Sequence, residues 1–337
     1  MTVPLHVLHL VGSAVDDGFA DLSRLYARGA LQALADPDRY RHSVAHVAPD
    51  GRWRFPADLE RGSIAAAAPL APGAAVAHLA GLGVDLALPQ MFCRPGMTSY
   101  RALFDVLGIP FLGNTAEVMA LAAHKGRAKA VVAAAGVAVP AGELLRPGDR
   151  PGVAVPAVVK PVDADNSDGV TLVRDPAGFD AALAGAFAHS GEVLVETYVE
   201  LGREVRCGVV VRDGELVCLP LEEYALDRVR TRADKLARDP DGELYLVAKD
   251  ATRSWIVDPA DPVTAAVHDA ALRAYAALGC RHYGLFDFRV DPDGRPWFLE
   301  AGPYCSYAPT SVVAVMARAA GIEPAELFAA GVAEALS

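Results

Sequence analysis

The sequence predicts an α/β protein, α+β in parts, with a parallel-sheet N-terminal domain followed by mixed β structure. Three observations support this fold class. Short apolar runs alternate with longer amphipathic segments through the first third of the chain, as in βαβ units. Later runs of strand length are joined by tight turns such as Arg212-Asp213-Gly214. A chain of 337 residues with 53% hydrophobic content also supplies enough apolar material for two or three compact units.

The N-terminal domain is expected to span residues 1–113. The runs of strand length are 5–11, 43–47 and 84–89, and the segments of helical length are 19–34 and 100–107. Parallel strands need crossover connections, which are usually helices. This alternation therefore predicts a mostly parallel sheet.

A central domain is expected over residues 114–196. A helical pattern from 116 to 135 is interrupted near His124, and Gly136 follows where a helix C-cap would lie. The β pattern resumes afterwards in the runs 151–161, 170–173 and 193–198. Mixed β structure thus replaces the parallel pattern.

The C-terminal domain is expected over residues 197–337. Its strands are 205–211, 215–220, 283–290 and 296–299, and a helix is expected over 262–278, with further helices at the end of the chain. The stretch 221–258 is charged, weakly periodic and rich in turn residues. Long stretches of this kind are usually surface insertions or active-site lids, so we expect a mobile loop there.

Charge and composition exclude several classes of protein. The 42 acidic residues outnumber the 31 basic ones, and the net charge of -11 gives no attraction for nucleic acid or anionic lipid. The apolar stretch 64–80 contains prolines and is too short for a membrane span, and residues 1–10 lack the basic flank of a signal peptide. The 5 cysteines are odd in number and form no close pair. We therefore expect a soluble cytoplasmic enzyme with no nucleic-acid or membrane partner.

Two acidic residues, Asp287 and Glu300, fall on apolar strands joined by the turn 291–294. Pairing of these strands can bring the two carboxylates together, and buried carboxylates need a cation. Mg²⁺ binds one or two protein carboxylates and completes its shell with water and phosphate. The spacing fits equally well two carboxylates that face solvent beside the turn or pair with Arg289.

Two further segments have weaker patterns. Lys160 ends an apolar strand and precedes a small polar loop that contains Gly169, an arrangement that suits a phosphate clamp but also a solvated charge. The acidic segment 196–204 joins two strands. Its backbone and carboxylates can bind an adenosine moiety, although a charged hairpin would have the same pattern.

Taken in order, these segments resemble the D-Ala-D-Ala ligase branch of the ATP-grasp superfamily along nearly the whole chain. The resemblance implies three subdomains, with the nucleotide site between the central and C-terminal ones, and ATP and Mg²⁺ as cofactors. The residues that match the nucleotide contacts of that family are Lys125, Lys160, Asn166, Ser167, Gly169, Glu196, Val199, Glu204 and Lys235. Asp287 and Glu300 match metal ligands, and Ser311 matches a serine that holds the carboxylate of the incoming amino acid. The resemblance also suggests a homodimer.

Four positions depart from the family pattern. Gly302 stands where a third metal ligand, an asparagine, is expected, and Leu285 replaces an arginine that stabilises the tetrahedral oxyanion. Met91 and Gly96 replace the histidine and glutamate of an HGxxGED segment. The stretches 88–93, 201–208 and 298–302 instead resemble the homologue from mycosporine-like amino acid biosynthesis, which joins serine or threonine to mycosporine-glycine.

The activity implied by this resemblance is an ATP-dependent, ADP-forming C–N ligation. ATP would phosphorylate the ring carbonyl oxygen of mycosporine-glycine, and the amine of serine or threonine would displace phosphate to give an imine, as in shinorine or porphyra-334. Lys235, Ser306 and Ser311 are the expected catalytic residues, and Met91, Arg94, Ser306 and Ser311 the expected substrate contacts. A dipeptide ligase such as D-Ala-D-Ala ligase and a non-catalytic nucleotide-binding protein are the alternatives.

Overall fold

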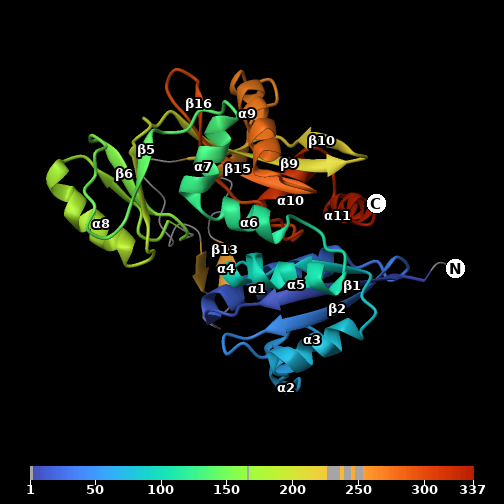
Figure 1. Cartoon of the computed structure of the whole chain (residues 1–337). Helices are drawn as coiled ribbons and strands as arrows, with labels where there is room; N and C mark the ends of the chain where they lie inside the picture. The colour runs from blue at the N-terminus through green and yellow to red at the C-terminus, as the bar shows by residue number, and fades with distance from the viewer. Residues whose placement is uncertain (1–2, 165–166, 226–235, 239–243, 247–252) are drawn as a thin grey trace.

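A computed structural model describes residues 3–164, 167–225, 236–238, 244–246 and 253–337. In Figure 1 the N-terminal part, drawn in blue and cyan, lies below the C-terminal part, and the central sheet, drawn in green, lies to one side. The structure matches the expected fold class, because a mostly parallel N-terminal sheet is followed by antiparallel sheets. No helix among the described residues is long and apolar enough to cross a membrane.

The N-terminal sheet has the strand order β3-β2-β1-β4. Its strands are β1 (Leu5–Gly12), β2 (Tyr40–Val47), β3 (Trp53–Arg54) and β4 (Leu86–Pro89). Strand β1 pairs in parallel with β2 and β4, as predicted, and β3 is an antiparallel edge. The helices are α1 (Asp17–Ala33), α2 (Arg61–Ala66), α3 (Pro72–Ala80), α4 (Arg94–Met97) and α5 (Ser99–Leu107).

The central sheet is antiparallel and has the order β5-β8-β6-β7. Its strands are β5 (Gly142–Leu145), β6 (Ala157–Pro161), β7 (Thr171–Val173) and β8 (Val193–Thr197). Helix α8 (Phe179–Phe187) buries Phe179, Leu183 and Ala186 against it. The sequence patterns predicted neither β5 nor α8.

The C-terminal sheet has the order β14-β11-β9-β15-β16, and β10 pairs with β9. Its strands are β9 (Arg203–Arg212), β10 (Glu215–Cys218), β11 (Glu222–Tyr224), β14 (Ser254–Ile256), β15 (Tyr283–Val290) and β16 (Pro296–Ala301). The predicted β9–β10 hairpin is present, and its turn residues Asp213 and Gly214 both have positive φ, 53° and 76°. Within the expected loop 221–258, the described residues include β11, β14 and the paired strands β12 (Leu236–Arg238) and β13 (Leu244–Leu246).

The two faces of this sheet are covered differently. On one face, α6 (Ala116–Ala122), α7 (Lys125–Ala134) and α9 (Val263–Leu278) pack over a cluster that includes Val132, Val267 and Phe286. Helix α7 therefore shares a hydrophobic core with the C-terminal sheet. On the other face, α10 (Val312–Ala319) and α11 (Pro324–Ala335) share a cluster with Val7 and Leu88 of the N-terminal sheet.

Candidate active site

The expected carboxylate pair is formed by adjacent strands. Asp287 on β15 pairs with Glu300 on β16, and both side chains line a pocket that also extends to the central sheet. Arg289 Nη2 lies 2.9 Å from Glu204 Oε2. Arg206 on β9 places its Nη2 2.9 Å from Asp287 Oδ2.

A buried carboxylate lies between two ammonium groups at the other side of the pocket. Glu196 Oε1 lies 2.6 Å from Lys160 Nζ, and Glu196 Oε2 lies 2.6 Å from Lys129 Nζ. The three side chains are at most 9% exposed. Burying such charges is tolerated only when they are paired, which accounts for the short contacts. Glu196, one of the expected nucleotide contacts, therefore also orients Lys160.

Lys125 connects the two halves of the pocket. Its Nζ donates to the carbonyl oxygen of Ala164 at 2.6 Å, in the loop after β6, and lies 3.6 Å from Glu300 Oε2. Its position follows from the predicted helix break: His124 is the N-cap of α7, and the ring nitrogen Nδ1 accepts from the Arg127 backbone N–H. Lys125 therefore presents its charge between the loop and the carboxylate pair.

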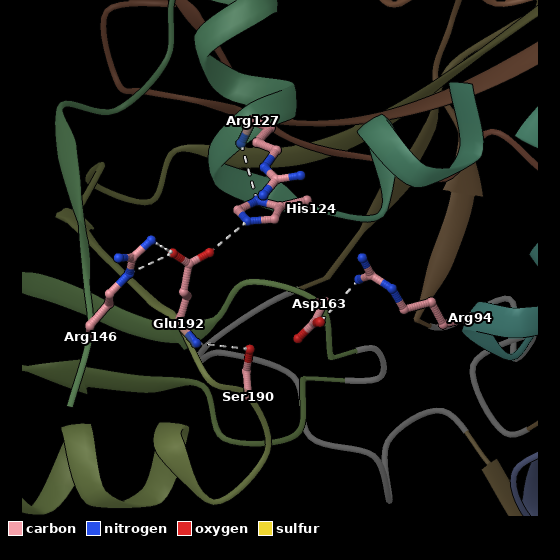
Figure 2. Close-up of polar contacts among 7 residues, drawn as sticks. All are labelled: Arg94, His124, Arg127, Arg146, Asp163, Ser190 and Glu192. Atoms are coloured by element: carbon pink, nitrogen blue, oxygen red, sulfur yellow. Dashed lines mark hydrogen bonds and ion pairs between the residues drawn. The ribbon is translucent and has the colours of Figure 1, made fainter. Parts of the chain in front are cut away.

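Contacts of Glu192 hold this helix start against the central sheet. Figure 2 shows Glu192 between the His124 ring, 3.2 Å away, and Arg146, also 3.2 Å away. Hydrogen bonds from His124 and Arg146 lower the pKa of Glu192. Because His124 caps α7, this cluster orients the first turn that contains Lys125.

The structure brings most of the predicted nucleotide contacts together. The pocket is lined by the following predicted residues: Lys125, Lys160, Ser167, Glu196, Val199, Glu204, Asp287 and Glu300. Gly169 lies beside this group with φ of 71°, and a Cβ there would come within 2.9 Å of the Pro161 and His189 side chains. The loop therefore requires glycine at this position. Asn166 and Lys235 lie outside the described residues.

The predicted substrate contacts lie elsewhere, and among the described residues none of the four lines this pocket. Met91 is buried in the N-terminal core, and Arg94 Nη1 lies 3.0 Å from Asp163 Oδ2, as Figure 2 shows. Ser306 is buried, and its hydroxyl accepts from the Ala308 backbone N–H at 3.3 Å. Ser311 is the N-cap of α10 and accepts from the Ala314 backbone N–H at 3.4 Å. Ser311 thus has a capping role in addition to any substrate role.

Sequence reasoning missed two cations of the site, Lys129 and Arg206. Lys129 had a usable signal, because it follows Lys125 by four positions on one helix and shares its face. For Arg206 the signal was its position two residues after Glu204 on the same strand. Alternate residues of a strand face the same way, so this position places Arg206 on the same side as that predicted contact.

Lys129 gives the protein a testable pH dependence. Burial is the largest influence and lowers the pKa of Lys129 to about 8; the nearby Lys160 ammonium lowers it further, and the Glu196 carboxylate opposes both. An unfolded lysine keeps its proton to a higher pH, so between pH 8 and about 10.4 the unfolded chain binds more protons and stability rises with pH. We expect the free energy of unfolding of wild type, relative to Lys129→Met, to increase over this range. Chemical denaturation at pH 7.5, 8.5 and 9.5 measures it, and a constant difference would contradict the assignment.

The donor set fits the expected cofactors. Two adjacent carboxylates present the oxygen ligands that Mg²⁺ prefers, and Lys125 and Lys160 provide positive charge on the same pocket for nucleotide phosphates. At Gly302, an added Cβ would meet nothing nearer than Tyr304 at 3.7 Å. The absent third ligand is therefore not a result of crowding.

Comparison with known proteins agrees with this geometry. Residues 151–332 match the family model described as D-ala D-ala ligase C-terminus. The chain is 30% identical over 336 residues to the D-alanine--D-alanine ligase A of Mesorhizobium japonicum, covering 90% of this chain and 89% of that protein. It is 32% identical over 258 residues to the D-alanine--D-alanine ligase of Citrifermentans bemidjiense, covering 74% and 78%.

Solved structures show the same fold. The VanG D-Ala:D-Ser ligase of Enterococcus faecalis superposes with a TM-score of 0.81 at 21% identity, covering 98% of this chain and 99% of that one. The D-alanine-D-alanine ligase of Coxiella burnetii gives a TM-score of 0.79 at 20% identity, covering 99% and 94%. The family match, the sequence identity over most of the chain and the pocket of paired lysines and carboxylates lead to one conclusion: this chain belongs to the D-Ala-D-Ala ligase family.

Proposed function

We propose that the chain is an ATP-dependent ligase that joins the amine of an amino acid to a small molecule activated by phosphorylation of an oxygen. The observation that carries this proposal is the pocket in which Lys125 and Lys160 face Asp287 and Glu300. Phosphoryl transfer depends on positioning and on neutralising the phosphate charge, and these residues can do both. Bound Mg²⁺ would supply additional positive charge on the phosphates, held by Asp287 and Glu300.

Two phosphate acceptors are compatible with this reaction. The first is the carboxylate of a D-amino acid, which would give a dipeptide. The comparisons favour this acceptor over any other, because the relatives reported above are named as D-alanine--D-alanine or D-Ala:D-Ser ligases. The second is the ring carbonyl oxygen of mycosporine-glycine, with serine or threonine as the amine, as the departures in the sequence suggest.

Two departures support the second acceptor. A Cβ at Gly96 would lie 2.3 Å from Met91 Cβ, so the glutamate of the family pattern does not fit beside this methionine without a backbone shift. Leu285 packs in an apolar cluster with Tyr283 and Cys305. We therefore take mycosporine-glycine as the proposed natural substrate and the dipeptide as the competing one.

The reaction explains why an apolar residue suits position 285. The carbonyl of a vinylogous amide carries charge on oxygen and can attack the γ-phosphorus of ATP, with ADP leaving. Attack of the amine on the resulting iminium-like carbon removes positive charge, whereas attack on an acyl phosphate creates an oxyanion. Phosphate then leaves, the amine loses its proton, and an imine remains. Only the dipeptide reaction requires a cation at position 285.

We predict opposite effects of Leu285→Arg in the two reactions. If the product is an imine, turnover falls more than ADP affinity; if it is a dipeptide, the guanidinium supports the oxyanion and turnover rises. Leu285→Met keeps the apolar volume and is the control for packing. Steady-state ADP release and ADP titration measure both quantities, with thermal melting to confirm folding. Unchanged turnover with native ADP affinity would show that Leu285 serves packing alone.

The direct test is incubation of the purified chain with ATP, Mg²⁺ and two substrate sets: mycosporine-glycine with a panel of amino acids, and pairs of D-amino acids. ADP release, product mass and ultraviolet absorption are followed together. An imine absorbs at longer wavelength than the ring carbonyl, so a red shift with serine or threonine supports the proposal. ADP release with D-alanine pairs alone would assign the dipeptide reaction, and none with any substrate would indicate a non-catalytic protein.

A further inference from the structure

A row of charged residues crosses the face of the C-terminal sheet that lines the pocket. Arg206 on β9 pairs in register with Glu222 on β11 at one side and with Asp287 on β15 at the other. Asp287 in turn pairs with Glu300 on β16. Because paired residues lie on the same side of a sheet, Arg206 is the one cation in a row of three carboxylates.

The environment of Arg206 is polar, and its side chain is mostly covered. Its side chain is 18% exposed, its Nη2 lies 2.9 Å from Asp287 Oδ2, and its Nη1 donates to the Tyr224 hydroxyl at 3.4 Å. The guanidinium also lies over the Tyr224 ring, 5.0 Å from its centroid. The Tyr224 hydroxyl donates to Glu222, which completes the row. These contacts fix the guanidinium at the pocket wall.

The guanidinium keeps hydrogen-bonding capacity that the described residues do not use. An arginine has five N–H donors, and the contacts above use only part of them. Nε is buried without a hydrogen-bond partner among the described residues. A buried donor without a partner is costly, so its retention in a pocket wall indicates a ligand acceptor.

The position of Arg206 relates it to the departure at position 285. Leu285 lies two residues before Asp287 on β15, on the same face, and pairs with Gly208 of β9. Arg206 therefore occupies the neighbouring strand, beside the carboxylate pair instead of the apolar cluster around Leu285. Lys125, an expected phosphate contact, lies 3.6 Å from Glu300 of the same carboxylate pair. A guanidinium beside this pair is therefore near the side of the pocket that is expected to hold phosphate.

Resting on the function proposed above, we infer that Arg206 is a further active-site residue whose guanidinium binds oxygens of the transferred phosphoryl group. Guanidinium groups suit this task because their planar donors match phosphate oxygens. The group would neutralise charge as the phosphoryl group leaves ADP and again as phosphate leaves the imine carbon. It would do so without placing a cation at the carbon under attack.

A structural role would have a different signature. If Arg206 only orients Asp287, its loss lowers the binding affinity of every ligand on that side of the pocket, MgADP and phosphate alike. If it binds the phosphoryl group, its loss weakens phosphate but leaves MgADP binding unchanged or tighter, because Asp287 no longer has a competing cation. The two ligands therefore respond with different signs.

The experiment compares wild type with Arg206→Met, Arg206→Lys and the control Arg212→Met. Arg212 lies on the same strand and pairs with Glu326 outside the pocket. MgADP affinity is measured by calorimetry, and inorganic phosphate is then titrated into the MgADP-saturated protein and followed by ³¹P NMR. We expect Arg206→Met to weaken phosphate binding by roughly 10- to 100-fold with MgADP affinity retained, Arg206→Lys to be intermediate, and Arg212→Met to match wild type.

Three results would overturn the inference: equal phosphate affinity in wild type and Arg206→Met, parallel loss of phosphate and MgADP, or no phosphate binding to a wild type that binds MgADP. Failure of wild type to bind MgADP would instead remove the proposed function on which the inference rests. Thermal melting of each variant distinguishes a folding defect from these outcomes, and Arg206→Lys keeps the charge if the methionine variant is unstable.

Discussion

Asp287→Asn is expected to lower the rate of ADP release by more than about 100-fold, because residues that merely support metal ligands already cost 10- to 100-fold when removed. The amide keeps the shape of the carboxylate but removes the negative charge that faces both the expected metal and Arg206 Nη2 at 2.9 Å. Steady-state kinetics over a range of Mg²⁺ concentrations tests this. Part of the loss is expected to be recovered at high Mg²⁺, since a weakened site can be filled by mass action.

A matched control lies in the same hairpin. Asp291 accepts from Trp297 Nε1 at 2.8 Å in the turn between β15 and β16, outside the pocket. Asp291→Asn should leave the Mg²⁺ dependence of the rate unchanged. If Asp287→Asn behaves like Asp291→Asn, the carboxylate pair is not the metal site.

Gly302→Asn adds the side-chain ligand of the family pattern at a position where space exists. The number of Mn²⁺ ions bound per chain, measured by electron paramagnetic resonance, should then be higher than in wild type.

Glu196→Gln is expected to give the largest loss of stability, about 3–5 kcal/mol, as when one partner of a buried ion pair is removed. The substitution leaves Lys129 and Lys160 buried, each with its ammonium 2.6 Å from the position that lost its charge. Nucleotide affinity should fall as well, because Lys160 loses the contact that orients it. Denaturant unfolding and ADP titration measure the two effects.

Removing the repulsion between the Lys129 and Lys160 ammonium groups should restore part of the lost stability. The double variant Lys129→Met with Glu196→Gln leaves a single buried ammonium, so it should be more stable than Glu196→Gln alone. Glu192→Gln is the control, because Glu192 also contacts two basic side chains but is more exposed than Glu196. This variant should change the free energy of unfolding little. A Glu196→Gln protein as stable as Glu192→Gln would contradict the assignment of a paired, buried charge.

The sequence alone determined the features that depend on local pattern. Alternation of strand and helix predicted the parallel N-terminal sheet, and the turn 291–294 between apolar strands predicted the pairing of Asp287 with Glu300. The interruption near His124 predicted the break between α6 and α7 and with it the helix start that presents Lys125. These features are encoded by periodicity and turn residues over a few neighbouring positions.

Only the tertiary structure decided which charges meet. Lys129, Lys160 and Glu196 come from α7, β6 and β8, and nothing local to any of them shows that both ammonium groups share one carboxylate. Asp287 likewise forms an ion pair with Arg206, which comes from another strand and lies directly opposite it in the strand register. Burial and register arise when separate elements pack, and they decide whether a charged residue lies in solvent or in the active site.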